Sequence, residues 1–194
     1  MSLDLAPGEK EPLASAYMAG QREDFILMMV GGIALDPSTK MPIVVLQDPD
    51  NKLNLPIWVG PLEATAIATE REGIKSPRPM THDLLRNLLA ELGATVEAAE
   101  ITALRESTYY ARILLKTREG KALELDSRPS DAIAVALRTK SPIYVAKKVL
   151  EDSSELREVE GEPGASDQNL AGVSRDKWAE ILERMSPDDF KYKM

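Results

Sequence analysis

The residues best suited to chemistry lie in the segment LDSRPSD, just before the apolar run Ala132 to Leu137. Asp126 and Asp131 are carboxylates that a strand–helix junction could bring together, and such a pair could hold a divalent ion that activates water. Mg²⁺ and Mn²⁺ prefer oxygen ligands of this kind. Arg128 could hold a phosphate through two parallel N–H groups. The segment therefore indicates metal-assisted chemistry on a phosphate ester.

The same segment also suits a purely structural role. Pro129 is favoured in the first turn of a helix, and Asp131 near a helix N-terminus is stabilised by the helix dipole. Arg128 can pair with either carboxylate. Helix capping does not explain why Asp126, Arg128 and Ser130 accompany Pro129 and Asp131. The residue types leave both interpretations open.

A second group of candidates lies in the segment EREGIKSPRPMTHDLLR. Its two prolines stiffen a loop that carries Lys75 and Arg78, and these cations could bind phosphate. His82 follows at the start of a predicted helix, where it could act as a general acid or base near neutral pH. The structural alternative is that His82 packs at the helix start and the loop is simply solvated.

Several common chemistries are excluded by what the sequence lacks. It has no GxxxxGK[ST] or GxGxxG loop for nucleotides and no GxSxG turn for a serine nucleophile. His82 is the single histidine, which excludes sites built from several histidines, and the absence of cysteine excludes disulfides and zinc–thiolate sites. The chemistry that remains is that of carboxylates and cationic side chains acting on a phosphate.

Charge is distributed unevenly along the chain. The net charge is −8, but residues 24–150 hold 16 basic and 16 acidic side chains. The acidity belongs to the ends, with a net charge of −2 over residues 1–23 and −6 over residues 151–194. A local basic patch for nucleic acid is therefore compatible with the middle of the chain. No run of 18 apolar residues and no secretory leader is visible, which predicts a cytoplasmic protein without a membrane span.

The hydrophobic periodicity predicts an α+β fold, with a largely antiparallel mixed sheet packed with two to three helices and a C-terminal helical extension. Strands are expected over 25–35, 41–47, 53–60, 95–105, 108–117, 122–126 and 142–146. Helices are expected over 61–73, 81–93 and 129–139, followed by a helical turn to about Glu151. Thr81 is the expected cap of the second helix. Gly31-Gly32 and the change of phase between Ala98 and Ala99 predict β-bulges. The expected organisation is a flexible lead (1–23), the α+β domain (24–151), an acidic linker (152–173) and an amphipathic helix with a tail (174–194).

Four segments in order, LDPSTKMPIVVLQD, LPIWVGPLEATAIA, EGIKSPRPMTHDLL and LDSRPSDAIAVALRTKSPIYV, resemble the bifunctional nuclease domain family of bacteria and plants. The resemblance covers about Asp24 to Glu151. One departure is Leu62, where the family usually has phenylalanine, a change that affects packing. The resemblance implies an α+β domain that usually self-associates, with nuclease activity on DNA and RNA attributed to some members. Family motif positions in this chain include Glu63, Arg78, Thr81, His82, Asp83, Asp126, Arg128, Ser130 and Asp131.

The resulting hypothesis is a metal-assisted nuclease of low sequence specificity that acts on DNA, RNA or both. Asp126 and Asp131 would hold Mg²⁺ or Mn²⁺, Arg78 and Arg128 would bind phosphate, and His82 would be the general acid or base. A homo-oligomer, dimer or larger, is expected. The alternative is a non-enzymatic oligomeric binding or regulatory protein with a cleft for an anion or a protein.

Overall fold

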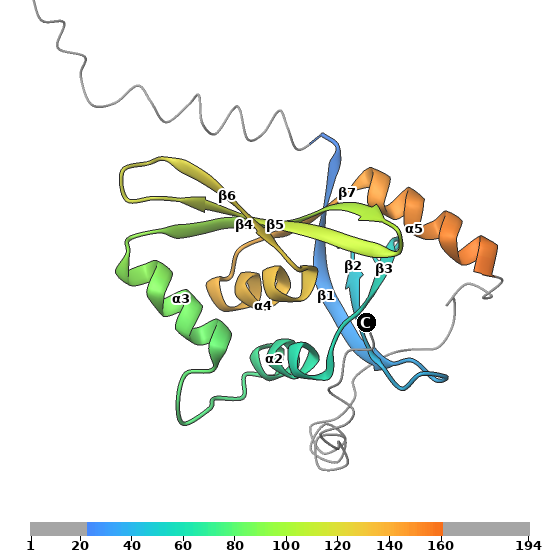
Figure 1. The fold of residues 1–194 in the computed structure, drawn as a ribbon, viewed down its shortest axis with the longest axis horizontal. Helices are drawn as coiled ribbons and strands as arrows, with labels where there is room; N and C mark the ends of the chain where they lie inside the picture. The colour runs from blue at the N-terminus through green and yellow to red at the C-terminus, as the bar shows by residue number, and fades with distance from the viewer. Residues whose placement is uncertain (1–22, 161–194) are drawn as a thin grey trace, which may run out of the picture.

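The computed structural model describes residues 23–160, which form a mixed sheet and the helices that pack on it (Figure 1). The α+β class predicted from the sequence is confirmed. The strands are β1 (Phe25–Leu35), β2 (Pro42–Gln47), β3 (Asn54–Trp58), β4 (Thr95–Arg105), β5 (Thr108–Lys116), β6 (Ala122–Ser127) and β7 (Ile143–Ala146). The helices are α2 (Pro61–Arg71), α3 (Thr81–Glu91), α4 (Pro129–Thr139) and α5 (Lys147–Glu160).

Strand β7, the last strand in the sequence, joins two antiparallel meanders into one sheet. Its order is β3-β2-β1-β7-β4-β5-β6. The pairing of β7 with β4 is parallel, and every other pairing in the described part of the chain is antiparallel. Strand β7 therefore lies at the centre of the sheet, while β3 and β6 form its edges. The sheet is largely antiparallel, as predicted.

The glycine pair of β1 marks a β-bulge, which confirms the prediction. The register between β1 and β2 shifts between Val30 and Gly32. A Cβ at Gly31 would collide with the side chain of Gln47 on β2, so the glycine leaves room for that side chain at the bulge. In β4 the register shifts between Val96 and Ala98, slightly before the predicted change of phase, and again between Ile101 and Ala103. These bulges change which side chains of long strands face the core.

Helix α4 lies in the middle of the hydrophobic core, which explains its unbroken apolar run. It contacts β4 and β5 on one side and α2 and α3 on the other. Figure 1 shows these three helices gathered on one side of the sheet. All five residues from Ala132 to Ala136 have no exposed surface. A helix covered on all sides needs apolar residues around its whole circumference, so the amphipathic pattern of a surface helix is absent.

Two helix ends differ from the predictions. The cap of α3 is Met80 rather than Thr81, because the carboxylate of Asp83 accepts the Met80 N–H at 2.9 Å and occupies the capping role. Helix α5 runs to Glu160 rather than ending near Glu151, so the first residues of the predicted linker are helical. The lead up to residue 22, the rest of the linker and the predicted helix at 174–194 lie outside the described residues. None of the helices in the described part of the chain is long and apolar enough to cross a membrane.

Candidate active site at the junction of three helices

Four polar side chains from separate elements meet beside the first turn of α4. Glu63 lies in the first turn of α2, His82 in the first turn of α3, Arg128 immediately before α4 and Asp131 in its first turn. Since α4 contacts both α2 and α3, the helix starts converge on one place. The structure therefore brings together three of the predicted site residues, His82, Arg128 and Asp131, and adds Glu63, which the sequence had marked only as a family motif position.

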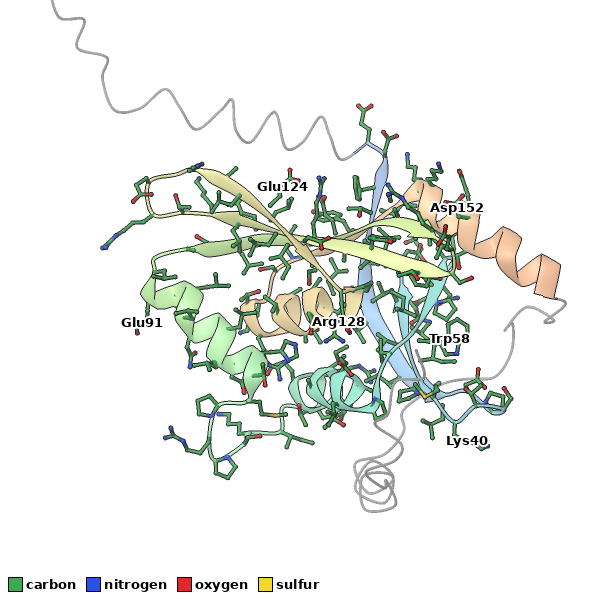
Figure 2. The ribbon with its side chains drawn as sticks, in the orientation of Figure 1. Lys40, Trp58, Glu91, Glu124, Arg128 and Asp152 are labelled. Atoms are coloured by element: carbon green, nitrogen blue, oxygen red, sulfur yellow. The ribbon has the colours of Figure 1, made fainter. Side chains whose placement is uncertain are left out.

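Arg128 links two carboxylates. Its Nε and Nη2 donate to the two oxygens of Asp131 at 2.8 and 3.1 Å, and its Nη1 lies 2.9 Å from Glu63 Oε1. The hydrogen bond to Asp131 is the largest cause that raises the pKa of Arg128 above its ordinary value, with Glu63 adding to it. The side chain remains 56% exposed, and Figure 2 shows it beside α4 on the side of α2. A guanidinium has five N–H donors, so two remain for a ligand.

His82 is oriented by the same carboxylate. Its Nε2 lies 3.1 Å from Asp131 Oδ1, and its side chain is only 12% exposed. Burial raises the pKa of Asp131, but the hydrogen bonds from Arg128 and His82 outweigh burial and leave the pKa below its ordinary value. Ionised Asp131 can only accept, so the proton of a neutral imidazole sits on Nε2 and Nδ1 carries a lone pair. A histidine held this way is suited to proton transfer through Nδ1.

The neighbouring Asp83 anchors the other end of α4. Its Oδ1 accepts from Arg138 Nε at 2.7 Å, and Arg138 Nη1 donates to the Ala134 carbonyl at 3.0 Å. Burial acts to raise the pKa of Asp83, but the Met80 N–H and Arg138 together lower it below its ordinary value. The Arg138 side chain is 1% exposed. Arg138 was not among the residues predicted from the sequence, although a single arginine in an otherwise apolar helix is a signal for a buried ion pair.

Asp126 lies apart from this group. It pairs across the strands with Arg112, and Arg112 pairs with Glu100. Cross-strand partners share a face of a sheet, and successive residues alternate between faces. The next residue pair, Leu125 and Ile113, belongs to the face of the core on which α4 packs, so Asp126 is exposed on the opposite face.

Figure 2 shows Glu124, which shares that opposite face with Asp126, on the side of the sheet away from α2 and α4. The structure thus does not bring Asp126 and Asp131 together. Both oxygens of Asp131 already accept hydrogen bonds. Among the described residues no group of three or more His, Cys, Asp or Glu side chains is arranged to hold a metal ion. As arranged here, the two carboxylates do not fit a shared Mg²⁺ or Mn²⁺ ion.

Arg78 lies on the loop between α2 and α3, beside a pocket of about 370 Å³. The pocket is lined by the end of α2, the proline loop, the start of α3 and Arg138. Asp83 also borders it, so the pocket adjoins the His82–Asp131 pair through the first turn of α3. Arg78 is exposed and forms no ion pair with a carboxylate of residues 23–153.

Comparison with known proteins places the chain in a family. The family model described as bifunctional nuclease domain matches residues 44–158. An uncharacterized protein of Mycobacterium tuberculosis is 38% identical over 166 residues, which cover 84% of this chain and 96% of that protein. Bifunctional nuclease 1 of Oryza sativa is 29% identical over 133 residues (68% of this chain, 40% of the rice protein). Bifunctional nuclease 1 of Arabidopsis thaliana is 29% identical over 155 residues (76% of this chain, 47% of the plant protein), so the chain spans less than half of either plant relative. The chain belongs to the bifunctional nuclease domain family.

Proposed function

We propose that the chain is a nuclease that hydrolyses phosphodiester bonds of DNA, RNA or both with little sequence preference, at the site formed by His82, Arg128 and Asp131. Family membership supports the reaction class. The observation that carries the site is the contact between His82 Nε2 and Asp131 Oδ1, at 3.1 Å, beside an arginine that keeps free donors. The relatives named as bifunctional nucleases supply the substrate class.

In the proposed reaction His82 moves a proton. Its Nδ1 accepts a proton from the water that attacks phosphorus, and the resulting imidazolium is stabilised by ionised Asp131. The bond between phosphorus and the leaving oxygen breaks, that oxygen takes up a proton from solvent, and His82 then returns its proton to solvent. Arg128 donates its two unused N–H groups to the non-bridging oxygens, whose charge increases in the transition state. Arg78 attracts the neighbouring phosphate of the strand.

A requirement for Mg²⁺ or Mn²⁺ stays a prediction. Asp126 and Asp131 were the expected ligands, and their positions on opposite sides of the sheet do not fit a shared ion. No step of the proposed reaction passes through a metal. Chelation and metal addition therefore form separate arms of the assay.

The test is a cleavage assay on single-stranded DNA and RNA with four identically purified proteins: wild type, His82→Ala, Asp131→Asn and the exposed control Asp50→Asn. Activity must co-elute with the protein on a sizing column, because contaminating nucleases are a common artefact. We expect His82→Ala to lose roughly 10²–10⁴-fold in rate, Asp131→Asn to lose activity as well, and Asp50→Asn to match wild type. Equal cleavage by all four proteins, or none by any, would refute the proposal.

A second candidate function is binding without catalysis. The ion pairs Arg128–Glu63 and His82–Asp131 connect α4 to α2 and α3, and each carboxylate is already satisfied. Such a network can serve only to hold the helices together. In that case Asp131→Asn lowers stability while the chain binds nucleic acid or protein without cleaving it. Thermal unfolding of the same variants, measured beside the cleavage assay, separates the two functions.

We also propose that the chain self-associates through α3. Leu84, Leu88 and Leu92 recur at helical spacing on one stripe and are 63%, 52% and 67% exposed. A straight apolar stripe is self-complementary when two copies of a helix pack antiparallel, as a two-fold dimer requires. Sedimentation of wild type and Leu88→Glu tests this: a dimer that dissociates in the variant supports it, and a wild-type monomer at high concentration contradicts it. The cytoplasmic location stays a prediction, to be tested by cell fractionation.

A further inference from the structure

The loop that joins α2 to α3 builds a pocket from which the proposed reaction uses only Arg78. Its volume of about 370 Å³ lies in the range of sites for small ligands, roughly 300–1,000 Å³. Figure 1 shows this loop linking the end of α2 to the start of α3, on the far side of both helices from the sheet. The pocket therefore opens next to the first turn of α3, from which His82 reaches the candidate active site.

The pocket is positively charged within a chain whose net charge is −8. Four cationic side chains and two acidic ones line it, which leaves a net charge of +2. Lys75 and Arg78 are exposed and form no ion pair with a carboxylate in the described part of the chain. Unpaired cations around a concave surface attract and hold an anionic group such as phosphate. The cationic residues are Lys75, Arg78, Arg86 and Arg138, and the acidic ones are Glu70 and Asp83.

Much of the remaining wall of the pocket is apolar, with Thr69 and Ser76 as its uncharged polar side chains. Lys75 and Arg78 are flanked along the loop by the apolar residues Ile74, Pro77, Pro79 and Met80. Flat apolar surfaces beside phosphate-binding cations suit a nucleotide, whose base packs on the apolar surface while its phosphate meets the cations. Phosphate alone needs only the cations, and an apolar ligand needs none of them. The combination selects a ligand that has both parts.

The loop is held in place before any ligand arrives. At the end of helix α2 the Gly73 N–H donates to the backbone carbonyl of Glu70 at 3.1 Å, and the Ile74 N–H donates to the backbone carbonyl of Thr69 at 2.8 Å. Gly73 has φ +66°, the left-handed conformation that this helix ending requires. At the other end Asp83 accepts the Met80 N–H at 2.9 Å. Two prolines restrict the backbone between these anchors. A preformed site loses less conformational entropy on binding than a flexible one.

The distance between the pocket and the catalytic residues allows one nucleic-acid strand to contact both. Asp131 and Arg138 lie seven residues apart on α4, which is roughly 10 Å at a rise of about 1.5 Å per residue. Arg138 lines the pocket and Asp131 holds His82. The pocket is therefore close enough to take a nucleotide next to the one that is cleaved.

From these features we propose that the pocket binds one unstacked nucleotide of a single-stranded substrate, adjacent to the phosphate that is cleaved. This inference rests on the proposed nuclease function. A base in a duplex is stacked and paired, and removing it costs a few kcal/mol. A single strand can present the base without most of that cost. The pocket thus makes the site selective for single-stranded nucleic acid by shape rather than by base sequence.

The test measures binding by the full 194-residue chain without relying on cleavage. Fluorescence anisotropy compares a labelled single-stranded hexanucleotide with the same sequence in a duplex, in EDTA, while a gel verifies that the strand stays intact. Adenosine 5′-monophosphate is titrated separately and followed by amide chemical shifts. The matched variants are Lys75→Ala in the pocket and Lys121→Ala in the exposed turn between β5 and β6. Circular dichroism checks that both variants are folded.

We expect the single strand to bind at least about tenfold more tightly than the duplex, as unstacking costs of this size imply. Lys75→Ala should weaken single-strand binding several-fold and reduce the slope of log affinity against log salt by about 0.7, whereas Lys121→Ala should match wild type. The mononucleotide should shift the amides of residues 73–76, Arg78 and Met80, since Pro77 and Pro79 have no N–H. Equal affinity for both substrates, equal behaviour of the two variants, or shifts elsewhere would overturn the inference. Binding in the pocket without cleavage would refute only the proposed nuclease function, and cleavage without pocket binding only this inference.

Discussion

Removing the carboxylate of Asp83 should destabilise the protein strongly, because it leaves a buried charge without its partner. Arg138 is 1% exposed at its side chain and depends on Asp83 at 2.7 Å, with one further hydrogen bond to the Ala134 carbonyl. Breaking a buried ion pair costs about 3–5 kcal/mol. Asp83 is 19% exposed, so water can reach one side of the pair. We therefore expect Asp83→Asn to cost about 3 kcal/mol, at the lower end of that range.

Urea unfolding followed by circular dichroism measures this cost, and thermal unfolding gives an independent reading. For a chain of this size 1 kcal/mol corresponds to about 2–4 °C in Tm, so the variant should melt about 6–12 °C lower. Asp50→Asn is the matched control, because the pair between Lys52 and Asp50 is 76% and 69% exposed. Such surface pairs contribute about 0–1 kcal/mol.

A double variant isolates the charge from the rest of the substitution. Adding Arg138→Met to Asp83→Asn removes the unpaired guanidinium and keeps a long apolar side chain in the core. The double variant should then be more stable than Asp83→Asn alone by at least about 1 kcal/mol. A loss below about 1 kcal/mol for Asp83→Asn, or no recovery in the double variant, would refute the interpretation that Arg138 is a buried charge dependent on Asp83.

Three further outcomes follow from the structure. Ile101 has no exposed surface, so Ile101→Ala should cost about 2–5 kcal/mol and Ile101→Val about 0.5–1.5 kcal/mol in urea unfolding. Gly73 has φ +66° and open space around the position of a Cβ, so Gly73→Ala should cost about 1–2 kcal/mol from backbone strain alone. The pKa of Asp131 is lowered from 3.8, so its contribution to stability is present above pH 3.8 and is lost as the pH falls through the lowered value. Asp131→Asn should therefore show a smaller loss of stability on acidification than wild type in pH-dependent melting.

The strands and the first helices could be predicted because their boundaries are set by local signals. Turn residues separate the strands, Pro61 and Pro129 begin α2 and α4, and the glycine pair of β1 gave the bulge correctly. The end of α5 is not set locally, because its polar composition is also typical of a linker. Tertiary contacts continue past Glu151, because Ser153 is buried and accepts a hydrogen bond from the hydroxyl of Tyr109 at 3.1 Å. Such long-range contacts override local composition.

The site was predictable in its residue types but not in its geometry. His82 and Asp131 are 49 positions apart, and nothing in their order requires that α3 and α4 bring them together. Asp126 lies close to Asp131 in the chain, yet the alternation of β6 turns it to the opposite face. The leucines of β6 carried this information, because Leu125 pairs with the core residue Ile113 and the next residue, Asp126, must face the other way. Any chemistry at this junction must then come from residues at the starts of helices, which packing holds in place, rather than from the end of an edge strand.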